Sequence, residues 1–261
     1  MIVSLANPKV KRVRMLQSRR RARYREHRFV IEGVRLAEEV VRAGLVPDFV
    51  LYVASLAEEA RGAAVLEALE GLGAPCHLVD DAVMRACTDT ETPPGLVAVL
   101  PFVRLPAPDH PTFTLVVDGV RTPGNLGAIL RTAAAAGVDW VLLAPGTVDL
   151  YNPKTVRGGA GAHFRIPTRA MGWREVRRHL EGQDVWLAAA RGDVPYTVVN
   201  WRKPIALIVG GEARGVSQEA QELAHGRVVI PMERGVESLN AAVATGILLF
   251  EVVRQRRSAS A

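Results

Sequence analysis

The pattern of hydrophobic positions in the second half of the chain predicts strands that run into loops of glycine and polar residues. The first strand ends near Asp118, and a helix follows in which apolar residues recur at helical spacing up to Gly137, a residue suited to end it. The second strand is the apolar run 205–209, which opens into the loop 210–215. Because continuous apolar runs are typical of parallel strands buried on both faces, we expect an α/β fold with a parallel sheet.

A third strand, residues 227–232, leads through a polar loop to the last helix of the chain. Ser238 is a suitable N-cap for that helix. Residues 239–253 are apolar almost all round, so we expect the helix to be largely buried. In a parallel sheet, ligands bind at the carboxyl ends of the strands, where glycine lets backbone groups come close. The three loops therefore predict one shared ligand pocket.

Two common nucleotide-binding motifs do not occur in these loops. Residues 119–124 and 210–215 both read GxxxxG, but neither is followed by the Lys and the Ser or Thr that a phosphate-binding P-loop needs. Neither loop supplies GxGxxG with an acidic residue about twenty positions further on, as a dinucleotide site requires. The sequence therefore excludes a P-loop and disfavours a nucleotide-dependent oxidoreductase.

Segments 125–133, 210–215 and 230–232 with 238–240 resemble the three ordered motifs of the SpoU/TrmH family. This family belongs to the SPOUT class of methyltransferases, and its members transfer a methyl group from S-adenosylmethionine to a ribose 2′-hydroxyl in RNA. The resemblance covers residues 113–256. It implies a carboxyl-terminal domain with a deep trefoil knot, which usually works as a homodimer.

The resemblance also implies roles for individual residues. It implies Arg131 as the catalytic arginine and Asn125 as its partner, and it assigns Glu212, Ser238 and Asn240 to the other two catalytic motifs. Six positions would hold the cofactor: Gly210, Gly211, Ile230, Met232, Ser238 and Leu239. A guanidinium is a poor proton acceptor, so we expect Arg131 to orient the RNA phosphate and to stabilise developing negative charge.

Three of these residues also have a simpler interpretation, which the sequence leaves open. Arg131 could be a solvated arginine on a helix surface. Glu212 could be a carboxylate on a loop surface. Asn125 could cap a helix, a role that is compatible with function.

Basic residues are concentrated near the start of the chain. The net charge is +6, and residues 9–28 hold ten Lys and Arg against one Glu. Such a concentration favours the binding of a polyanion, here RNA. A solvated basic helix and attraction to an anionic membrane are the alternatives. We predict RNA contacts for seven residues: Lys9, Lys11, Arg12, Arg19, Arg20, Arg21 and Arg23.

The length of 261 residues fits two domains. The proline-rich stretch 105–112 is predicted to link an RNA-binding domain, residues 1–104, to the methyltransferase domain, residues 113–261. The first domain should be a smaller α/β unit, and it resembles the amino-terminal domain of several family members, itself similar to a small ribosomal protein. Its expected elements are a helix at 33–43, a strand at 49–53, a helix at 56–72 and a strand at 96–100.

The cysteines and histidines predict neither a metal site nor a disulfide framework. Cys76 and Cys87 form no CxxC pair, and the six histidines lack ligand spacing. No signal peptide opens the chain, and no apolar run reaches the length of about 18 residues that a membrane helix needs. We therefore expect a cytoplasmic protein without a membrane partner.

The expected function is that of an S-adenosylmethionine-dependent methyltransferase acting on the ribose 2′-hydroxyl of RNA. Ribosomal RNA is the favoured substrate because the first domain resembles those of ribosomal-RNA modifiers. A tRNA ribose methyltransferase is the first alternative. A non-catalytic RNA-binding factor for ribosome assembly is the second.

Overall fold

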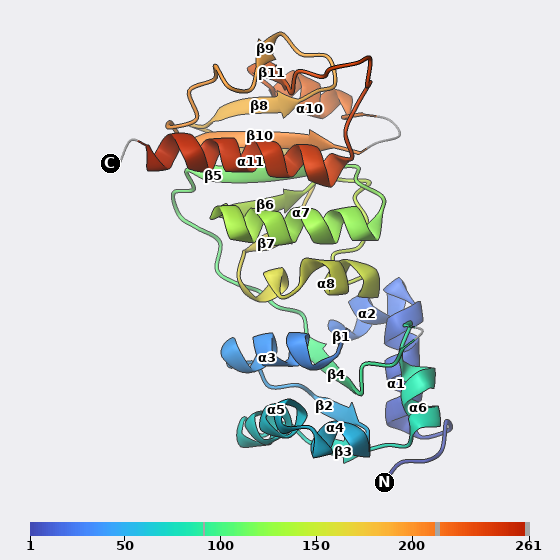
Figure 1. Ribbon diagram of the computed structural model, residues 1–261. Helices are drawn as coiled ribbons and strands as arrows, with labels where there is room; N and C mark the ends of the chain where they lie inside the picture. The colour runs from blue at the N-terminus through green and yellow to red at the C-terminus, as the bar shows by residue number, and fades with distance from the viewer. Residues whose placement is uncertain (91, 212–214, 259–261) are drawn as a thin grey trace. The chain divides into compact units, whose positions relative to one another are not determined.

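The structure is a computed structural model that describes residues 1–90, 92–211 and 215–258. The chain forms two compact units (Figure 1). The first unit contains residues 1–103 and 149–164, and the second contains residues 104–148 and 165–261. Glu212, one of the expected catalytic residues, lies outside the described residues.

The first unit is built on a four-stranded sheet with the strand order β1-β4-β2-β3. Strand β4 pairs antiparallel with both β1 and β2, whereas β2 and β3 are parallel. Its elements are α1 (Pro8–Ser18), α2 (Arg20–Glu26), β1 (Arg28–Glu32), α3 (Val34–Arg42), β2 (Phe49–Tyr52), α4 (Ala54–Glu58), α5 (Ala60–Gly71), β3 (Cys76–Leu78), α6 (Asp81–Cys87), β4 (Leu96–Pro101), α8 (Pro153–Gly159) and the 3-10 turn η1 (Ala162–Phe164).

The sequence predicted the helix at 33–43 and the strands at 49–53 and 96–100 to within one residue of the ends of α3, β2 and β4. The single helix expected over 56–72 is instead two helices, α4 and α5, which are separated by Glu59 in an extended conformation. The two helices approach so closely that a Cβ atom on Gly62 would lie 2.0 Å from the carbonyl oxygen of Leu56. Only glycine permits this crossing.

Residues 149–164 fold with the first unit, although the sequence analysis placed them in the methyltransferase domain. Buried aromatic packing accounts for this difference. The ring of Tyr151 stacks on Phe102 with a centroid distance of 3.8 Å and lies 4.9 Å from the ring of Phe29. The side chain of His163 is buried, and its Nε2 atom lies 2.8 Å from the carbonyl oxygen of Leu150.

The second unit is a parallel α/β unit with seven strands in the order β7-β6-β5-β10-β8-β11-β9. Every strand pair in this sheet is parallel, as the apolar runs predicted. Its elements are β5 (Phe113–Asp118), α7 (Pro123–Ala136), β6 (Trp140–Leu143), β7 (Thr168–Ala170), α9 (Trp173–His179), β8 (Asp184–Ala188), β9 (Val194–Pro195), β10 (Ile205–Gly210), α10 (Gln218–Leu223), β11 (Gly226–Val229) and α11 (Ala241–Arg257).

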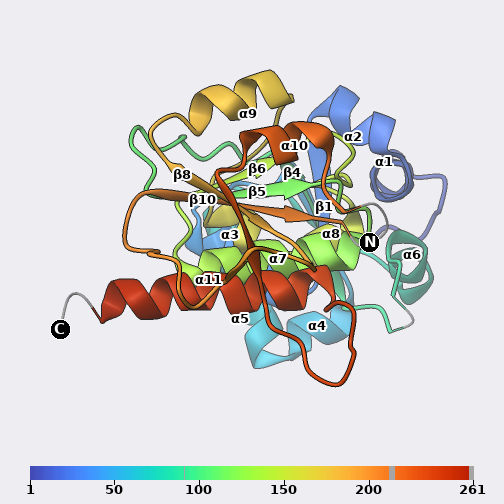
Figure 2. The same cartoon turned by 90° about the horizontal axis from the view of Figure 1, so that it is seen from above.

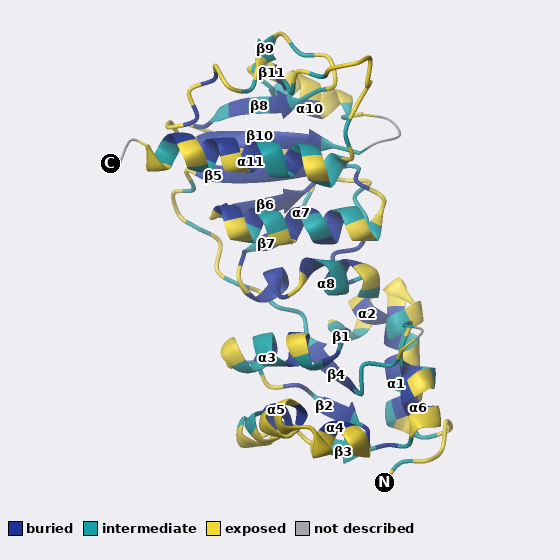
Figure 3. Cartoon of the chain, in the orientation of Figure 1, coloured by how far each residue is buried: buried dark blue, intermediate teal, exposed yellow. Residues whose placement is uncertain are grey.

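Helices cover both faces of this sheet, with α7 and α11 on one face and α9 and α10 on the other (Figure 2). The central strands β5 and β10 are buried along their length (Figure 3). On the face of α9 and α10, the core includes Val116, Ile208 and Val176. Since side chains alternate along a strand, Leu115 and Leu207 point to the opposite face, which α7 and α11 cover. The trefoil knot that the resemblance implies stays a prediction.

The two helices that flank the expected site differ in how well the sequence predicted them. Helix α7 ends at Gly137, which has φ 71° and caps it in the left-handed region, as predicted. Helix α11 is capped by Asn240 rather than by Ser238, so the expected N-cap was wrong. The expectation that α11 is largely buried is also wrong on one side, because Val243 is 52% exposed and Phe250 is 49% exposed.

Candidate functional site

The loops that follow β5 and β10 lie side by side at the carboxyl edge of the sheet. The two strands pair in parallel, and Gly210 stands opposite Asp118 in their register. The backbone N–H of Gly211 donates to the carbonyl oxygen of Asp118 at 3.0 Å. The buried carboxylate of Asp118 accepts a hydrogen bond of 2.6 Å from the backbone N–H of Ser217. The second loop is therefore attached to the first strand at both of its ends.

Glycine is required where these loops meet. A Cβ atom on Gly211 would lie 2.4 Å from the carbonyl oxygen of Gly119, and a Cβ on Gly210 would lie 2.9 Å from the carbonyl oxygen of Gly215. Both distances are shorter than a carbon and an oxygen that are not bonded can approach, and both neighbours are backbone atoms. Any larger residue at Gly211 would therefore push the two loops apart.

A cavity of about 290 Å³ opens at the same edge of the sheet, between the segments that follow β8, β10 and β11 and the first turns of α11. Most of its wall consists of backbone and small or aliphatic side chains, with Glu237, Ser238 and Thr245 as polar members. The cavity brings together all six residues that the resemblance implied for the cofactor: Gly210, Gly211, Ile230, Met232, Ser238 and Leu239.

The cavity is also lined by residues that were not predicted from the sequence. Ala188, Ala189 and Ala190 follow strand β8, which lies between β10 and β11 in the sheet. The segment after β8 thus joins the expected loops after β10 and β11, whereas the loop after β5, which was also expected to share the pocket, contributes none of the described lining residues. The alternating apolar positions Val185 and Leu187, followed by three alanines, were the available signal for this strand.

Asn125 and Asn240 meet at the start of the two helices on one face of the sheet. The side-chain oxygen of Asn240 accepts hydrogen bonds from the backbone N–H groups of Ala242 and Val243, at 2.9 and 3.3 Å, and so caps α11. Its amide nitrogen donates to the side-chain oxygen of Asn125 at 3.1 Å. Asn125 lies in the first turn of α7, so this bond connects the two helices.

Arg131 lies further along α7 and is exposed. It is not among the residues that line the cavity. Within the described parts of the chain, its guanidinium makes no hydrogen bond or ion pair, in contrast to several arginines of the first unit. The buried stripe Leu126, Ile129 and Leu130 holds α7 against the sheet without help from Arg131. The guanidinium is therefore free to bind an anion that comes from outside the chain.

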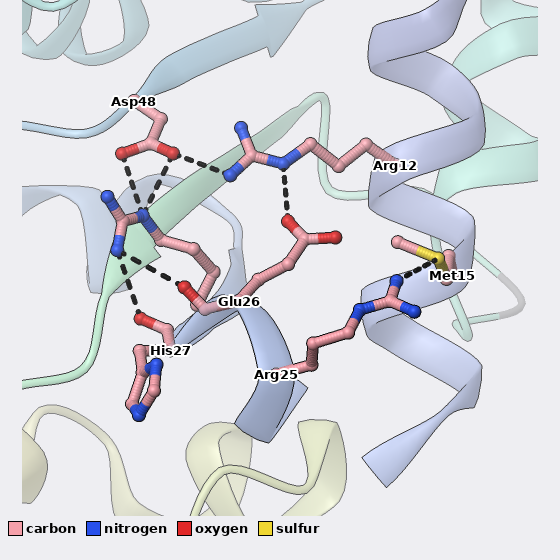
Figure 4. A network of polar contacts seen from close by, with 7 residues as sticks. Arg12, Met15, Arg25, Glu26, His27 and Asp48 are labelled. Carbon is pink, nitrogen blue, oxygen red and sulfur yellow. Dashed lines mark hydrogen bonds and ion pairs between the residues drawn. The ribbon is translucent and has the colours of Figure 1, made fainter. Parts of the chain in front are cut away.

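In the basic segment, residues 9–28, some side chains pair with carboxylates of the protein and others are exposed. Figure 4 shows Arg12 between Glu26 and Asp48, with its Nε and a terminal nitrogen each 2.8 Å from a carboxylate oxygen. Arg28 donates to the same Asp48 at 2.9 Å. Since these carboxylates already neutralise Arg12, it is a weaker candidate for binding RNA than the sequence indicated.

The surroundings of Arg23 differ most from those predicted. The sequence predicted an RNA contact for it. Its side chain is 4% exposed and donates to Asp149, at 2.9 Å from Nε and 2.6 Å from a terminal nitrogen. A further bond of 2.6 Å runs to the carbonyl oxygen of Leu16. Because this guanidinium is buried and bonded within the protein, the prediction that Arg23 contacts RNA is wrong.

Tyr24, which is 37% exposed, bonds to the same carboxylate from the edge of this group. Its hydroxyl donates to the second oxygen of Asp149 at 2.9 Å. Burial, together with the negative charge of Asp149, raises the pKa of Tyr24 to about 12. The phenol is therefore a neutral hydrogen-bond donor throughout the physiological pH range.

The described residues form neither a metal-binding cluster nor a membrane-spanning helix. No group of three or more His, Cys, Asp or Glu side chains in residues 1–90, 92–211 and 215–258 is arranged to hold a metal ion. Over the same residues, no helix has the length and apolar character needed to cross a membrane. Cys76 and Cys87 are free, and burial raises the pKa of each thiol to about 11.

Comparison with family models finds a match in each unit. Residues 112–250 match the SpoU rRNA Methylase family. Residues 7–98 match the MRM3-like substrate binding domain. The boundaries of the two matches place both main parts of the chain in known families.

Similar proteins cover nearly the whole chain. The 23S rRNA (guanosine(2553)-2′-O)-methyltransferase RlmP of Bacillus subtilis is 35% identical over 96% of this chain and 98% of its own length. The mitochondrial rRNA methyltransferase 3 of Homo sapiens is 31% identical over 90% of this chain and 69% of its own.

Solved structures agree in both units. A crystal structure of an AdoMet-bound rRNA methyltransferase from Sinorhizobium meliloti has a TM-score of 0.85 at 30% identity, covering 97% of each chain. The SpoU methyltransferase AviRb of Streptomyces viridochromogenes, in complex with AdoMet, has a TM-score of 0.86 at 27% identity, covering 97% of this chain and 99% of that one.

Proposed function

Because the chain belongs to the SpoU rRNA methylase family, we propose that it transfers the methyl group of S-adenosylmethionine to a ribose 2′-hydroxyl of ribosomal RNA. The observation that carries this proposal is the cavity at the carboxyl edge of the parallel sheet. It is lined by all six residues that the family motifs assign to the cofactor.

The cavity suits S-adenosylmethionine in its chemistry. Ala188, Val209 and Leu248 offer apolar surface to the adenine ring, and Gly210 and Gly211 leave backbone groups accessible to polar atoms of the cofactor. Ser238 supplies a hydroxyl on the same wall. When bound, S-adenosylmethionine supplies a methyl group that its sulfonium already activates. The protein then has to align the ribose with that methyl group and exclude water.

Arg131, Asn125 and Asn240 are proposed to act on the RNA. Arg131 would bind the phosphate next to the target ribose and stabilise the charge that develops on the 2′-oxygen. The proton of that hydroxyl passes to the phosphate or to water, because a guanidinium remains protonated. Asn240 and Asn125 would position the nucleotide through the amide groups that their mutual hydrogen bond fixes. Ser238 would orient both reactants from the cavity wall.

Gly211 offers a direct test of the cavity. Substitution Gly211→Ala places a Cβ atom 2.4 Å from the carbonyl oxygen of Gly119, so the loops must separate and the cavity must change shape. We expect the affinity for S-adenosylmethionine, measured by isothermal titration calorimetry, to fall about tenfold or more. Gly172→Ala is a control in the same unit, because Gly172 lies outside the cavity, has φ −76° and would bring a Cβ atom no closer than 4.0 Å to a neighbouring atom. An unchanged affinity of Gly211→Ala would mean that the cofactor binds elsewhere.

We further propose that the protein is a homodimer and that α11 contributes to its interface. Val243, Ile247 and Phe250 lie at helical spacing along one stripe of α11, where Val243 and Phe250 are about half exposed. Exposed apolar side chains in a row are typical of a surface that another protein covers. The resemblance to homodimeric enzymes makes a second copy of the chain the favoured occupant.

Substitution Phe250→Glu tests the dimer. A charge in the centre of an apolar interface has to be desolvated without a partner, which opposes association. We expect sedimentation equilibrium to show a dimer for the original protein and a monomer for the variant, while circular dichroism shows both to be folded. A monomeric original protein, or a variant that still dimerises, would contradict this assignment of the interface.

The substrate is tested with methyl-labelled S-adenosylmethionine and purified total ribosomal or total transfer RNA. We propose that label enters ribosomal RNA, since residues 112–250 match the SpoU rRNA Methylase family and the relative from Bacillus subtilis, which matches over 98% of its own length, is named as a 23S rRNA methyltransferase. Labelling of transfer RNA alone would favour the alternative substrate. Labelling of neither would favour a non-catalytic RNA-binding factor. As a ribosomal-RNA enzyme, the protein would work in the cytoplasm.

A further inference from the structure

The first unit contains a groove that none of the family motifs describes. Its volume is about 660 Å³, and it lies between one face of α1 and the end of α6. Lys11, Arg14 and Ser18 contribute to it from α1 at helical spacing, Arg19 follows directly, and Cys87 and Thr88 form the opposite wall. All of these residues belong to the first unit, so the groove is complete within it.

The cations of this groove differ from their neighbours in sequence. Arg12, Arg23 and Arg28 each have a carboxylate partner at 2.9 Å or less. The side chains of Lys11, Arg14 and Arg19 are exposed, and in the described part of the structure none of them is bonded to a carboxylate. The fold thus neutralises one set of basic side chains and leaves a second set facing the groove.

The composition of the wall favours an extended anion. Three cations stand against one carboxylate, Asp89, which leaves an excess of positive charge. The hydroxyl groups of Ser18 and Thr88 donate to backbone carbonyls of their own helices, so their protons are already bonded within the protein. A spacing of three residues on a helix separates Lys11 and Arg14 by about 5 Å, close to the separation of successive phosphates on a nucleic acid strand.

We infer that this groove, which we call the α1/α6 groove, binds two or three consecutive backbone phosphates of the RNA substrate through Lys11, Arg14 and Arg19. The inference rests on the proposed function and makes it more specific, because it assigns a defined docking site to the first unit. Phosphate contacts of this kind fix the position of an RNA without reading its sequence. The groove would therefore hold the RNA while the target ribose reaches the other unit.

The test uses the full chain and a fluorescein-labelled hairpin of ribosomal RNA as the probe. The groove variant carries Lys11→Ala, Arg14→Ala and Arg19→Ala together. A matched control carries Arg174→Ala, Arg177→Ala and Arg178→Ala, three exposed arginines of α9 in the other unit. The two variants lose the same net charge, so a difference between them reports the site rather than the overall charge.

Binding is measured by fluorescence anisotropy over a series of salt concentrations. Each lost phosphate contact lowers the slope of log K against log salt by about 0.7 to 0.9, so we expect the groove variant to lose about 2 units of slope or more. We expect its affinity near physiological salt to fall roughly tenfold to a hundredfold. The control variant should keep the original slope. An unchanged slope in the groove variant, or an equal loss in the control, would overturn the inference.

Two further measurements separate the groove from folding and from catalysis. Exchanging Arg14 and Arg19 for lysine keeps the charge, so this variant should retain the original slope, whereas a purely structural role would not be rescued by charge alone. The groove variant should still bind S-adenosylmethionine with unchanged affinity. If the original protein transfers no methyl group to any RNA, the proposed function fails, but the salt slope still tests the groove.

Discussion

Replacing Arg131 by alanine is expected to lower the rate of methyl transfer to RNA by about a hundredfold or more, the scale seen when one preorganised charge-stabilising donor is removed. Cofactor affinity should stay the same, because Arg131 does not line the cavity. Stability should also be unchanged, because the side chain is exposed and α7 packs through its apolar stripe. Single-turnover transfer of labelled methyl, with calorimetry for the cofactor, measures both effects.

Two variants sharpen this experiment. Arg131→Lys keeps the charge but loses the planar fork that binds a phosphate through two bonds, so its rate should lie between those of the original protein and the alanine variant. Arg177→Ala removes an exposed arginine from α9, far along the chain from the motifs, and should leave the rate unchanged. If Arg131→Ala transfers methyl groups at the original rate, Arg131 is a solvated surface residue and has no catalytic role.

Removing the carboxylate of Asp149 is expected to destabilise the first unit by about 3 to 5 kcal/mol. In the variant Asp149→Ala, the Arg23 guanidinium stays buried without its counter-ion, and the Tyr24 hydroxyl loses its acceptor. The Arg23 guanidinium is buried, so hydration does not compensate the loss of its counter-ion. The Tyr24 hydroxyl is partly accessible to water and contributes less. Urea unfolding followed by hydrogen exchange in α1 and β1 measures the change in that unit.

The design includes a control and a compensating variant. Glu38→Ala breaks the ion pair with Arg61 on an exposed surface and should have little effect. The double variant Arg23→Met and Asp149→Leu replaces both charges by apolar groups and should recover most of the lost stability. A small effect of Asp149→Ala would show that the pair is hydrated in solution, which would contradict its burial in the structure.

The apolar pattern predicted the parallel sheet because continuous hydrophobic runs such as 205–209 are typical of parallel strands buried on both faces. Once β5 and β10 pair in register, their loops must meet at one edge, so the strands predicted the edge at which the cavity opens, although the loop after β5 does not line it. The glycines at 210 and 211 were visible as motif positions. The physical reason for Gly211, its contact with the carbonyl oxygen of Gly119, depends on a pairing across almost a hundred residues, whereas Gly210 meets the carbonyl oxygen of Gly215 within the same loop.

The features that the sequence did not reveal depend on contacts between distant segments. Arg23 stands in a run of basic residues and could not be distinguished from its neighbours, because its partner Asp149 lies 126 positions further along the chain. Asn240 and Ser238 are both good N-caps, and only the structure shows that the side-chain oxygen of Asn240 accepts from the backbone N–H groups of Ala242 and Val243 and so caps α11. The exposed stripe of α11 could not be predicted, since an apolar helix looks the same whether its own chain or a second copy covers it.

The position of the transferred methyl group on the nucleoside shows whether the protein methylates the 2′-oxygen of ribose. Ribosomal RNA treated with the protein and labelled S-adenosylmethionine is digested to nucleosides, which are separated and analysed by mass spectrometry. We predict that the label appears in a 2′-O-methylated nucleoside, with the added mass on the sugar fragment, and that Arg131→Ala introduces it about a hundredfold more slowly. Label on a base fragment would show that the protein methylates a base and not the ribose.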